Sequence, residues 1–101
     1  MKINLAQISG FDWDKGNLRK NKDKHDVDNF ECEEVFFNKP LFFGLDKAHS
    51  LMEERRFVLG ITDAGRKLSL TFTVRKSLIR IISARDMSKK EREKYERNQK
   101  I

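Results

Sequence analysis

Apolar and polar residues alternate most clearly between positions 67 and 75. Four apolar residues fall on one side of this segment and five polar residues on the other: Leu68, Leu70, Phe72 and Val74 against Lys67, Ser69, Thr71, Thr73 and Arg75. A period of two is typical of a β-strand with one face in the core and one face open to solvent. Residues 57–61 alternate in the same way, and the turn residues 63–65 between the two segments predict a hairpin.

The next segment, residues 77–85, is apolar on both sides. Ile79 and Ile81 fall on one face, and Leu78 and Ile82 fall on the other. This pattern predicts a central strand that is covered on both faces.

Two helices are predicted before position 41. Asp14 is placed to cap a basic, weakly apolar surface helix from about residue 15 to residue 25. Asp28 and Glu31 form a capping-box pattern before a second helix over about residues 29–37. Pro40 cannot continue that helix, so the helix is expected to end shortly before it.

The two ends of the chain give weaker signals. Ser88 and Glu91 form a regular capping box, which predicts a last helix with Met87, Glu91 and Tyr95 on one narrow stripe. Residues 11–13 suggest a short edge strand with Trp13 as its core anchor, and residues 1–9 suggest a loose arm or an early strand.

The elements together predict an α+β fold. We expect an antiparallel sheet of about four to five strands, two N-terminal helices and one C-terminal helix. Helices packed on one face would leave the polar side of residues 67–75 free for a ligand.

Composition narrows the choice of partner. The 101 residues are 38% hydrophobic and 38% charged, which is enough apolar surface for one domain over residues 1–101. The net charge of +6 and the pI of about 9.6 favour polyanionic partners. A membrane surface is less favoured than nucleic acid, because no apolar run approaches the length of a bilayer span.

The lone Cys32 cannot form an internal disulfide, and the N-terminus lacks a signal-peptide pattern, so the cytoplasm is the expected compartment. Cys32, His25 and His49 show no recognisable ligand spacing, so we expect no metal site and no cofactor.

The polar side of residues 67–75 is the main candidate interface. Lys67, Arg75 and three hydroxyl groups, including those of Thr71 and Thr73, could follow a phosphate backbone, with Arg80 on a neighbouring strand. An ordinary solvated sheet face would give the same pattern.

Four further residues have two interpretations each. His25 and His49 titrate near neutral pH and could move protons, but each could equally be a surface or capping residue. Arg66 could clamp a phosphate or serve as a turn charge. Tyr95 could pack in the core, or it could stack on a base or donate a proton.

Several segments together resemble the BrnT family of toxins, over about residues 11–96. The segments that carry the resemblance are Phe11-Asp12-Trp13-Asp14-Lys15-Gly16-Asn17, Lys24-His25, residues 33–38, Asp46 with His49-Ser50, residues 53–57, Thr62-Asp63, Gly65-Arg66 and residues 79–87. The family usually has Gly after the Lys-His pair, where this chain has Asp26. Asp adopts a left-handed helix end less readily than Gly does, so the first helix could end differently.

The resemblance implies a RelE-like fold, a ribonuclease that blocks translation, and a BrnA-like antitoxin partner. Metal-independent cleavage needs cations for the phosphate and a base and an acid for proton transfer. We therefore expect Arg66, Arg80 and Arg85 to hold the phosphate and His25 and His49 to carry protons.

Two other functions fit the residues alone, since no Walker loop, dinucleotide fingerprint, H-E-x-x-H or G-x-S-x-G motif is present. One is a non-catalytic nucleic-acid-binding module, and the other is a protein-interaction subunit that meets an acidic partner.

Overall fold

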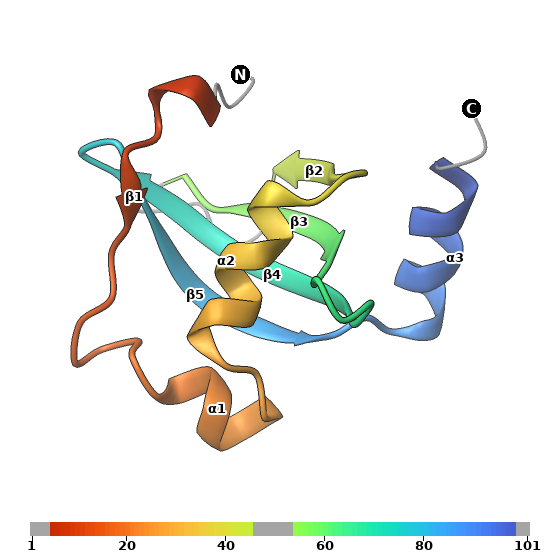
Figure 1. Cartoon of the computed structure of the whole chain (residues 1–101), viewed down its shortest axis with the longest axis horizontal. Coiled ribbons are helices and arrows are strands. Elements are labelled where there is room, and N and C mark those ends of the chain that lie inside the picture. Colours follow the sequence, from red (N-terminus) through yellow and green to blue (C-terminus); the bar gives the residue numbers. More distant parts are fainter. Residues whose placement is uncertain (1–4, 46–53, 99–101) are drawn as a thin grey trace.

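The computed structural model describes residues 5–45 and 54–98 of the chain. The α+β class is confirmed (Figure 1). In chain order the described elements are a 3-10 turn η1 (Leu5–Gln7), β1 (Gly10–Phe11), α1 (Lys20–His25), α2 (Asn29–Phe37), β2 (Phe42–Leu45), β3 (Arg56–Ile61), β4 (Lys67–Arg75), β5 (Leu78–Asp86) and α3 (Lys89–Asn98). No helix among the described residues is long and apolar enough to cross a membrane.

The sheet is mixed rather than purely antiparallel. Its strand order is β1-β5-β4-β3-β2, and the neighbours from β5 to β2 pair antiparallel. The expected edge strand is present as β1, but it pairs parallel with β5. Short antiparallel hairpins leave an alternating pattern that sequence reveals, whereas a two-residue parallel pairing across 68 positions leaves none. The strand predicted over residues 77–85 is β5, which lies inside the sheet between β1 and β4.

One apolar core lies between α2 and the sheet. Leu68, Leu70 and Phe72 of β4 are fully buried there, as expected, whereas Val74 is 38% exposed at the end of the strand. Phe36 of α2 packs edge-on against Phe72, with ring centroids 5.2 Å apart. The other buried members of this cluster are Val27, Cys32, Val35, Val58, Ile79, Ile81 and Ala84.

The opposite face of the sheet is only partly open, which corrects the expectation of a free polar face. In the β3–β4 register Phe57 lies opposite Thr71 and Leu59 opposite Ser69. Directly paired residues share a face, so the apolar series of β3 lies on the polar side of β4, and Arg56, Val58 and Gly60 share the face of Phe72, Leu70 and Leu68.

The third helix covers this apolar area. Leu59, Met87 and Tyr95 form a second buried cluster, and the Tyr95 hydroxyl donates to the Pro40 carbonyl at 2.7 Å. The expected capping box of α3 is present, since Ser88 N donates to Glu91 Oε1 at 2.8 Å. Figure 1 shows α3 at the end of the sheet, away from α2.

The helical expectations before residue 41 held for α2 and failed in part for α1. Asp28 N donates to Glu31 Oε1 at 3.0 Å, as the capping box requires. The first helix begins at Lys20 rather than near residue 15, because Asp14 binds Gly16 N and the Arg80 side chain instead of capping a helix. Asp26 adopts the left-handed conformation at its C-terminal end, with φ of 54°.

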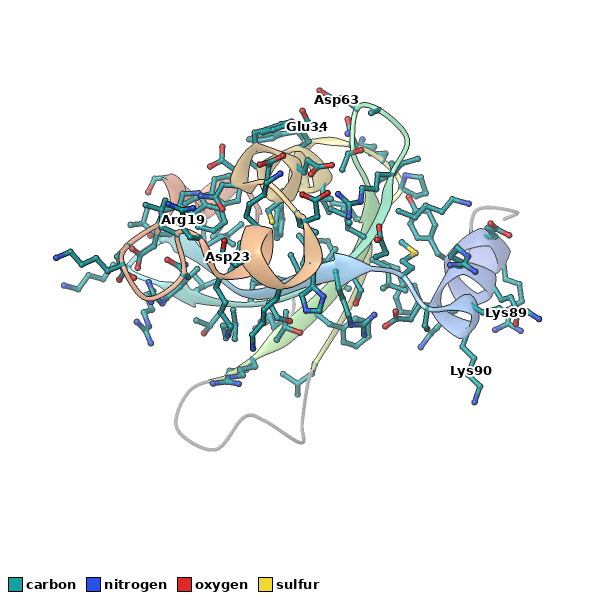
Figure 2. All side chains as sticks on the ribbon, turned by 90° about the horizontal axis from the view of Figure 1, so that it is seen from below. Arg19, Asp23, Glu34, Asp63, Lys89 and Lys90 are labelled. Carbon is teal, nitrogen blue, oxygen red and sulfur yellow. The ribbon has the colours of Figure 1, made fainter. Side chains whose placement is uncertain are left out.

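Two loops tie the layers together. The β3–β4 turn contains Gly65 at φ of 89°, as expected for a hairpin of this sequence. Figure 2 shows Glu34 of α2 beside Asp63 of this turn, and Asp63 N donates to Glu34 Oε1 at 3.1 Å. Near the N-terminus, Leu5–Gln7 form a 3-10 turn rather than a strand, and Ser9 N donates to the Ser77 carbonyl at 2.8 Å.

Candidate nucleic-acid interface

A row of polar residues follows the β4–β5 pair on the face opposite α2. The register places Ser69 opposite Arg85, Thr71 opposite Ser83, and Thr73 opposite Arg80. A bulge between Thr71 and Phe72 keeps Ile81 in the core while Arg80 and Ser83 both face outward. We call these six residues the β4–β5 stripe.

The stripe is covered at its ends and more open at its centre. Ser69 is 6% exposed, and its hydroxyl donates to Glu91 Oε2 at 3.3 Å. Thr73 is 2% exposed, and its hydroxyl donates to the Glu54 carbonyl at 2.9 Å. Thr71 and Ser83 are half-buried between them. The hydroxyl of Thr73 is therefore less available to a ligand than the sequence suggested.

Arg80 marks one end of the stripe. Its two terminal nitrogens donate to the two oxygens of Asp14 at 2.8 and 3.0 Å, and Asp12 lies 3.6 Å away. The hydrogen bonds from Arg80 lower the pKa of Asp14, and the same bonds raise the pKa of Arg80. Asn17 Oδ1 accepts a hydrogen bond from Asp14 N at 2.8 Å. The turn therefore fixes the Asp14 carboxylate, which in turn orients the Arg80 guanidinium.

Arg85 marks the other end, where it forms a similar pair with α3. Its terminal nitrogens donate to the two oxygens of Glu91 at 2.7 and 3.0 Å. Burial alone would raise the pKa of Glu91, but the hydrogen bonds from Arg85 and Ser88 N lower it to about 2. Arg85 is therefore held in a fixed position with its charge compensated.

Arg66 lies apart from Arg80, at the opposite end of β4. Its guanidinium bridges three elements, and its side-chain contacts are Asp86 at 2.7 and 3.2 Å, Glu31 at 3.2 and 3.3 Å, the Asp26 carbonyl at 2.8 Å and the His25 carbonyl at 3.3 Å. The hydrogen bond to Asp86 is the main cause of its raised pKa. The structure thus joins Arg66 to the end of α1 rather than to Arg80.

The remaining candidates are distributed as follows. The exposed His25 ends α1, and its charge contributes, after the Arg66 hydrogen bond, to the lowered pKa of Asp86. Lys67 pairs with Glu96 at 2.6 Å, and Arg75 lies exposed at the end of β4. Tyr95 is 1% exposed and so presents no ring face for stacking on a base. His49 lies outside the described residues.

A segment that the sequence did not indicate runs along the outer edge of β5. Asn17 Nδ2 donates to the Ile81 carbonyl at 3.1 Å, Lys20 Nζ donates to the Ile82 carbonyl at 3.1 Å, and Ala84 N donates to Asn21 Oδ1 at 2.9 Å. Figure 1 shows α1 beside β5. Asp14 and Glu91 were also missed as partners of the arginines. The Ser88 capping box pointed to Glu91, but no spacing in the sequence links Asp14 to Arg80.

Two comparisons bear on what this surface is for. A search of curated proteins found no match. The family model described as the ribonuclease toxin BrnT of type II toxin–antitoxin systems matches residues 13–91, which include the whole stripe and its carboxylate partners Asp14 and Glu91. The chain therefore belongs to the BrnT family of ribonuclease toxins from type II toxin–antitoxin systems.

Proposed function

We propose that this ribonuclease cleaves RNA on the β4–β5 stripe without a metal ion. The single observation that carries the proposal is the row of Arg80, Ser83 and Arg85, with Thr71 opposite Ser83 on the neighbouring strand. Guanidinium groups bind phosphate bidentately and stay charged, and hydroxyl groups can donate to phosphate or ribose oxygens.

The proposed reaction is an internal phosphoryl transfer. The ribose 2′-oxygen attacks the adjacent phosphorus, a base takes the 2′-hydroxyl proton, the bond from phosphorus to the 5′-oxygen breaks, and an acid protonates the leaving oxygen. The products are a 2′,3′-cyclic phosphate and a 5′-hydroxyl. Arg80 and Arg85 stabilise the charge that develops on the phosphate oxygens.

His25 and His49 are the proposed proton carriers. Arg66 supports this assignment for His25, since its guanidinium donates to the His25 carbonyl at 3.3 Å and so fixes the end of the helix that bears the ring. We therefore propose that Arg66 positions His25, while Arg80 and Arg85 contact the phosphate.

The carboxylate partners of the arginines affect how RNA binds. Asp14 occupies both terminal nitrogens of Arg80, and a phosphate has to share or displace those bonds. The pair with Asp14 keeps the Arg80 guanidinium in position before RNA arrives. The same pair weakens the binding of any single phosphate to Arg80, because the phosphate competes with the carboxylate.

Arg80 gives the direct test. In a cleavage assay with purified chain, Arg80→Ala should lower kcat/KM by about 10²- to 10³-fold. Arg80→Lys should recover little, because an ammonium group cannot bind bidentately. Lys90→Ala removes one exposed charge on α3 and is the matched control, with near-normal activity expected.

Two outcomes would contradict the proposal. One is full activity in a folded Arg80→Ala variant. The other is activity that disappears in a metal chelator and returns only with a divalent ion. Chromatography of the product ends checks the chemistry, since hydrolysis at the other phosphate bond would leave a 3′-hydroxyl instead of the cyclic phosphate.

We further propose a BrnA-like antitoxin in the cytoplasm as the partner. Phe30 and Phe37 lie two turns apart on α2 and are 59% and 79% exposed. Aromatic surface of this kind in a small protein supports a protein partner. Expression of the toxin alone should arrest growth, and co-expression of the product of an adjacent reading frame should restore it.

A non-catalytic RNA-binding module is the second candidate. It is favoured by the carboxylates that occupy Arg66, Arg80 and Arg85 in this structure. Purified chain would then retain RNA in a salt-dependent way with no cleavage over hours, and no single substitution would change the RNA fragments observed.

A further inference from the structure

We infer that the cations of residues 15–24 form a second RNA-binding row beside the stripe, with Lys20 as the phosphate contact nearest its centre. This inference rests on the proposed function, because it assumes that the stripe binds RNA. The row consists of Lys15, Arg19, Lys20 and Lys24, and we call it the α1 cation row.

The first argument is position. Contacts from four successive points of residues 14–26 follow β5 from Arg80 to Ala84: Asp14 binds Arg80, Asn17 binds the Ile81 carbonyl, Lys20 binds the Ile82 carbonyl, and Asn21 binds Ala84 N. The segment therefore runs the length of the stripe along the free edge of β5. Of its exposed cations, Lys20 contacts the β5 backbone at Ile82, next to Ser83 of the stripe.

The second argument is charge. In residues 5–45 and 54–98 none of the four cations of the α1 cation row is paired with a carboxylate, and all four are exposed. Lys22 is different, because it pairs with Asp26 at 2.7 Å and Asp28 at 3.4 Å. Arg66, Arg80 and Arg85 carry compensated charges, so the α1 cation row offers the stronger attraction for an incoming polyanion.

The third argument is spacing. Arg80 and Arg85 pair with Thr73 and Ser69, which are four residues apart on β4, or roughly 13 Å along a strand. A phosphate over Thr71 and Ser83 would lie between the two arginines, two residues along β4 from the partner of each. Lys20 Nζ lies 3.1 Å from the carbonyl of Ile82, which is the bulge residue between the two arginines. Lys20 is therefore placed to neutralise the central phosphate.

A binding experiment with the full-length chain tests whether Lys20 contacts a phosphate of bound RNA. The probe is a single-stranded RNA dodecamer with 2′-O-methyl riboses, which cannot be cleaved by 2′-oxygen attack. Lys20→Ala should weaken binding about three- to tenfold and reduce the slope of log K against log salt by about 0.7, the value for one phosphate contact on a single strand. Lys20→Arg should restore most of the affinity.

The matched control is the double variant Lys89→Ala and Lys90→Ala. It removes more charge than Lys20→Ala, but from the first turn of α3. Figure 2 shows both lysines on the opposite side of the molecule from Arg19. Their removal should change the affinity by less than Lys20→Ala does. An equal or larger loss in this control would mean that only net charge matters, and would overturn the inference.

Further outcomes separate the inference from the proposed function. If wild-type chain cleaves RNA and Lys20→Ala binds the probe with unchanged slope, the inference fails alone. If wild-type chain binds the probe through the row but does not cleave unmodified RNA, the proposed chemistry fails and the row stands. If the variants lose antitoxin binding while RNA affinity is kept, the row serves a protein and the inference is wrong.

Discussion

Arg80 and Arg85 are each held in place by a carboxylate at the surface of the sheet. Arg80 and Arg85 each use both terminal nitrogens on one carboxylate, in the geometry that they would use for a phosphate. Such a pair holds the guanidinium in a fixed plane at the surface. Arg66 uses the same chemistry for a structural purpose, because its bonds join α1, α2 and β5.

Arg66→Ala should destabilise the fold. The substitution removes the donor to Asp86, Glu31 and two helix-end carbonyls, and it leaves the half-buried Glu31 without its cation. We expect a loss of about 2–4 kcal/mol in the free energy of unfolding, measured by urea denaturation. Arg66→Lys should recover less than half of this loss, since an ammonium cannot reach all the acceptors.

An unchanged unfolding free energy in Arg66→Ala, together with lost cleavage, would reverse this assignment. It would move Arg66 from the scaffold to direct contact with RNA.

Cys32 should be chemically silent in the folded chain. The thiol is fully buried, and burial raises its pKa to about 12. The thiolate fraction at pH 8 is then on the order of 10⁻⁴, and reagents have no access. Alkylation by iodoacetamide should be negligible in buffer and rapid in urea. The urea concentration at which labelling becomes half-maximal should equal the midpoint of the unfolding transition. Fast labelling of folded chain would show that this part of the core opens.

At the scale of elements, some features could be predicted and others could not. The period of β4, the hairpin turn at Gly65 and the capping boxes of α2 and α3 are local, because neighbouring residues alone decide them. The start of α1 was misjudged because Asp14 binds Arg80, 66 positions away. Phe57 and Leu59 alternate with their neighbours in the same way on either face of the sheet. Only the register with β4 decides which face they occupy.

The candidate site divides in the same way. The alternation along β4 and the choice of Arg80 and Arg85 came from the sequence, but the position of the α1 cation row depends on how residues 14–26 pack along β5. Those contacts join side chains to carbonyls and amides of the backbone, which are common to all residues and leave no pattern in the sequence.

The contact between β3 and α2 should be sensitive to volume. A Cβ atom at Gly60 would lie 2.6 Å from Val35 Cγ1 and 3.0 Å from Leu41 Cδ2. Gly60→Ala should therefore cost about 1–3 kcal/mol through overpacking, seen as a lower Tm. Gly10→Ala is the control, because its Cβ would meet Leu78 Cδ2 at an ordinary 3.5 Å. Equal Tm values for the two variants would show that α2 moves freely over β3.

At the scale of the whole molecule, the two faces of the sheet have different tasks. One face holds α2 and most of the core, and its outer surface presents Phe30 and Phe37. The other face carries the stripe, with α3 at one end and residues 14–26 along its edge. Under the proposed function, RNA and a protein partner are recognised by separate surfaces of a chain of 101 residues.

The molecule should lose stability in acid. Hydrogen bonds from basic side chains lower the pKa values of Asp14, Asp26 and Asp86. At Glu91, burial raises the pKa, but hydrogen bonds from Arg85 and Ser88 lower it by more. The folded state then binds fewer protons than the unfolded state, so stability is full above about pH 4.5 and falls as the pH approaches 2. Glu91 alone contributes at most about 3 kcal/mol of this change.

Urea midpoints measured between pH 7 and pH 2.5 check this expectation. Glu91→Gln should be less stable at pH 7 and should show a shallower decline below pH 4.5. A midpoint that rises on acidification would contradict the ion-pair account.

The parallel pairing of β1 with β5 has a consequence for synthesis. Gly10 lies opposite Leu78 and Phe11 opposite Ile79. During synthesis β1 therefore cannot pair until β5, which follows it by more than 60 residues, has been made. Arg80 and Arg85 both belong to that final strand. A chain released before residue 80 lacks both guanidinium groups, so under the proposed function it cannot stabilise the reacting phosphate.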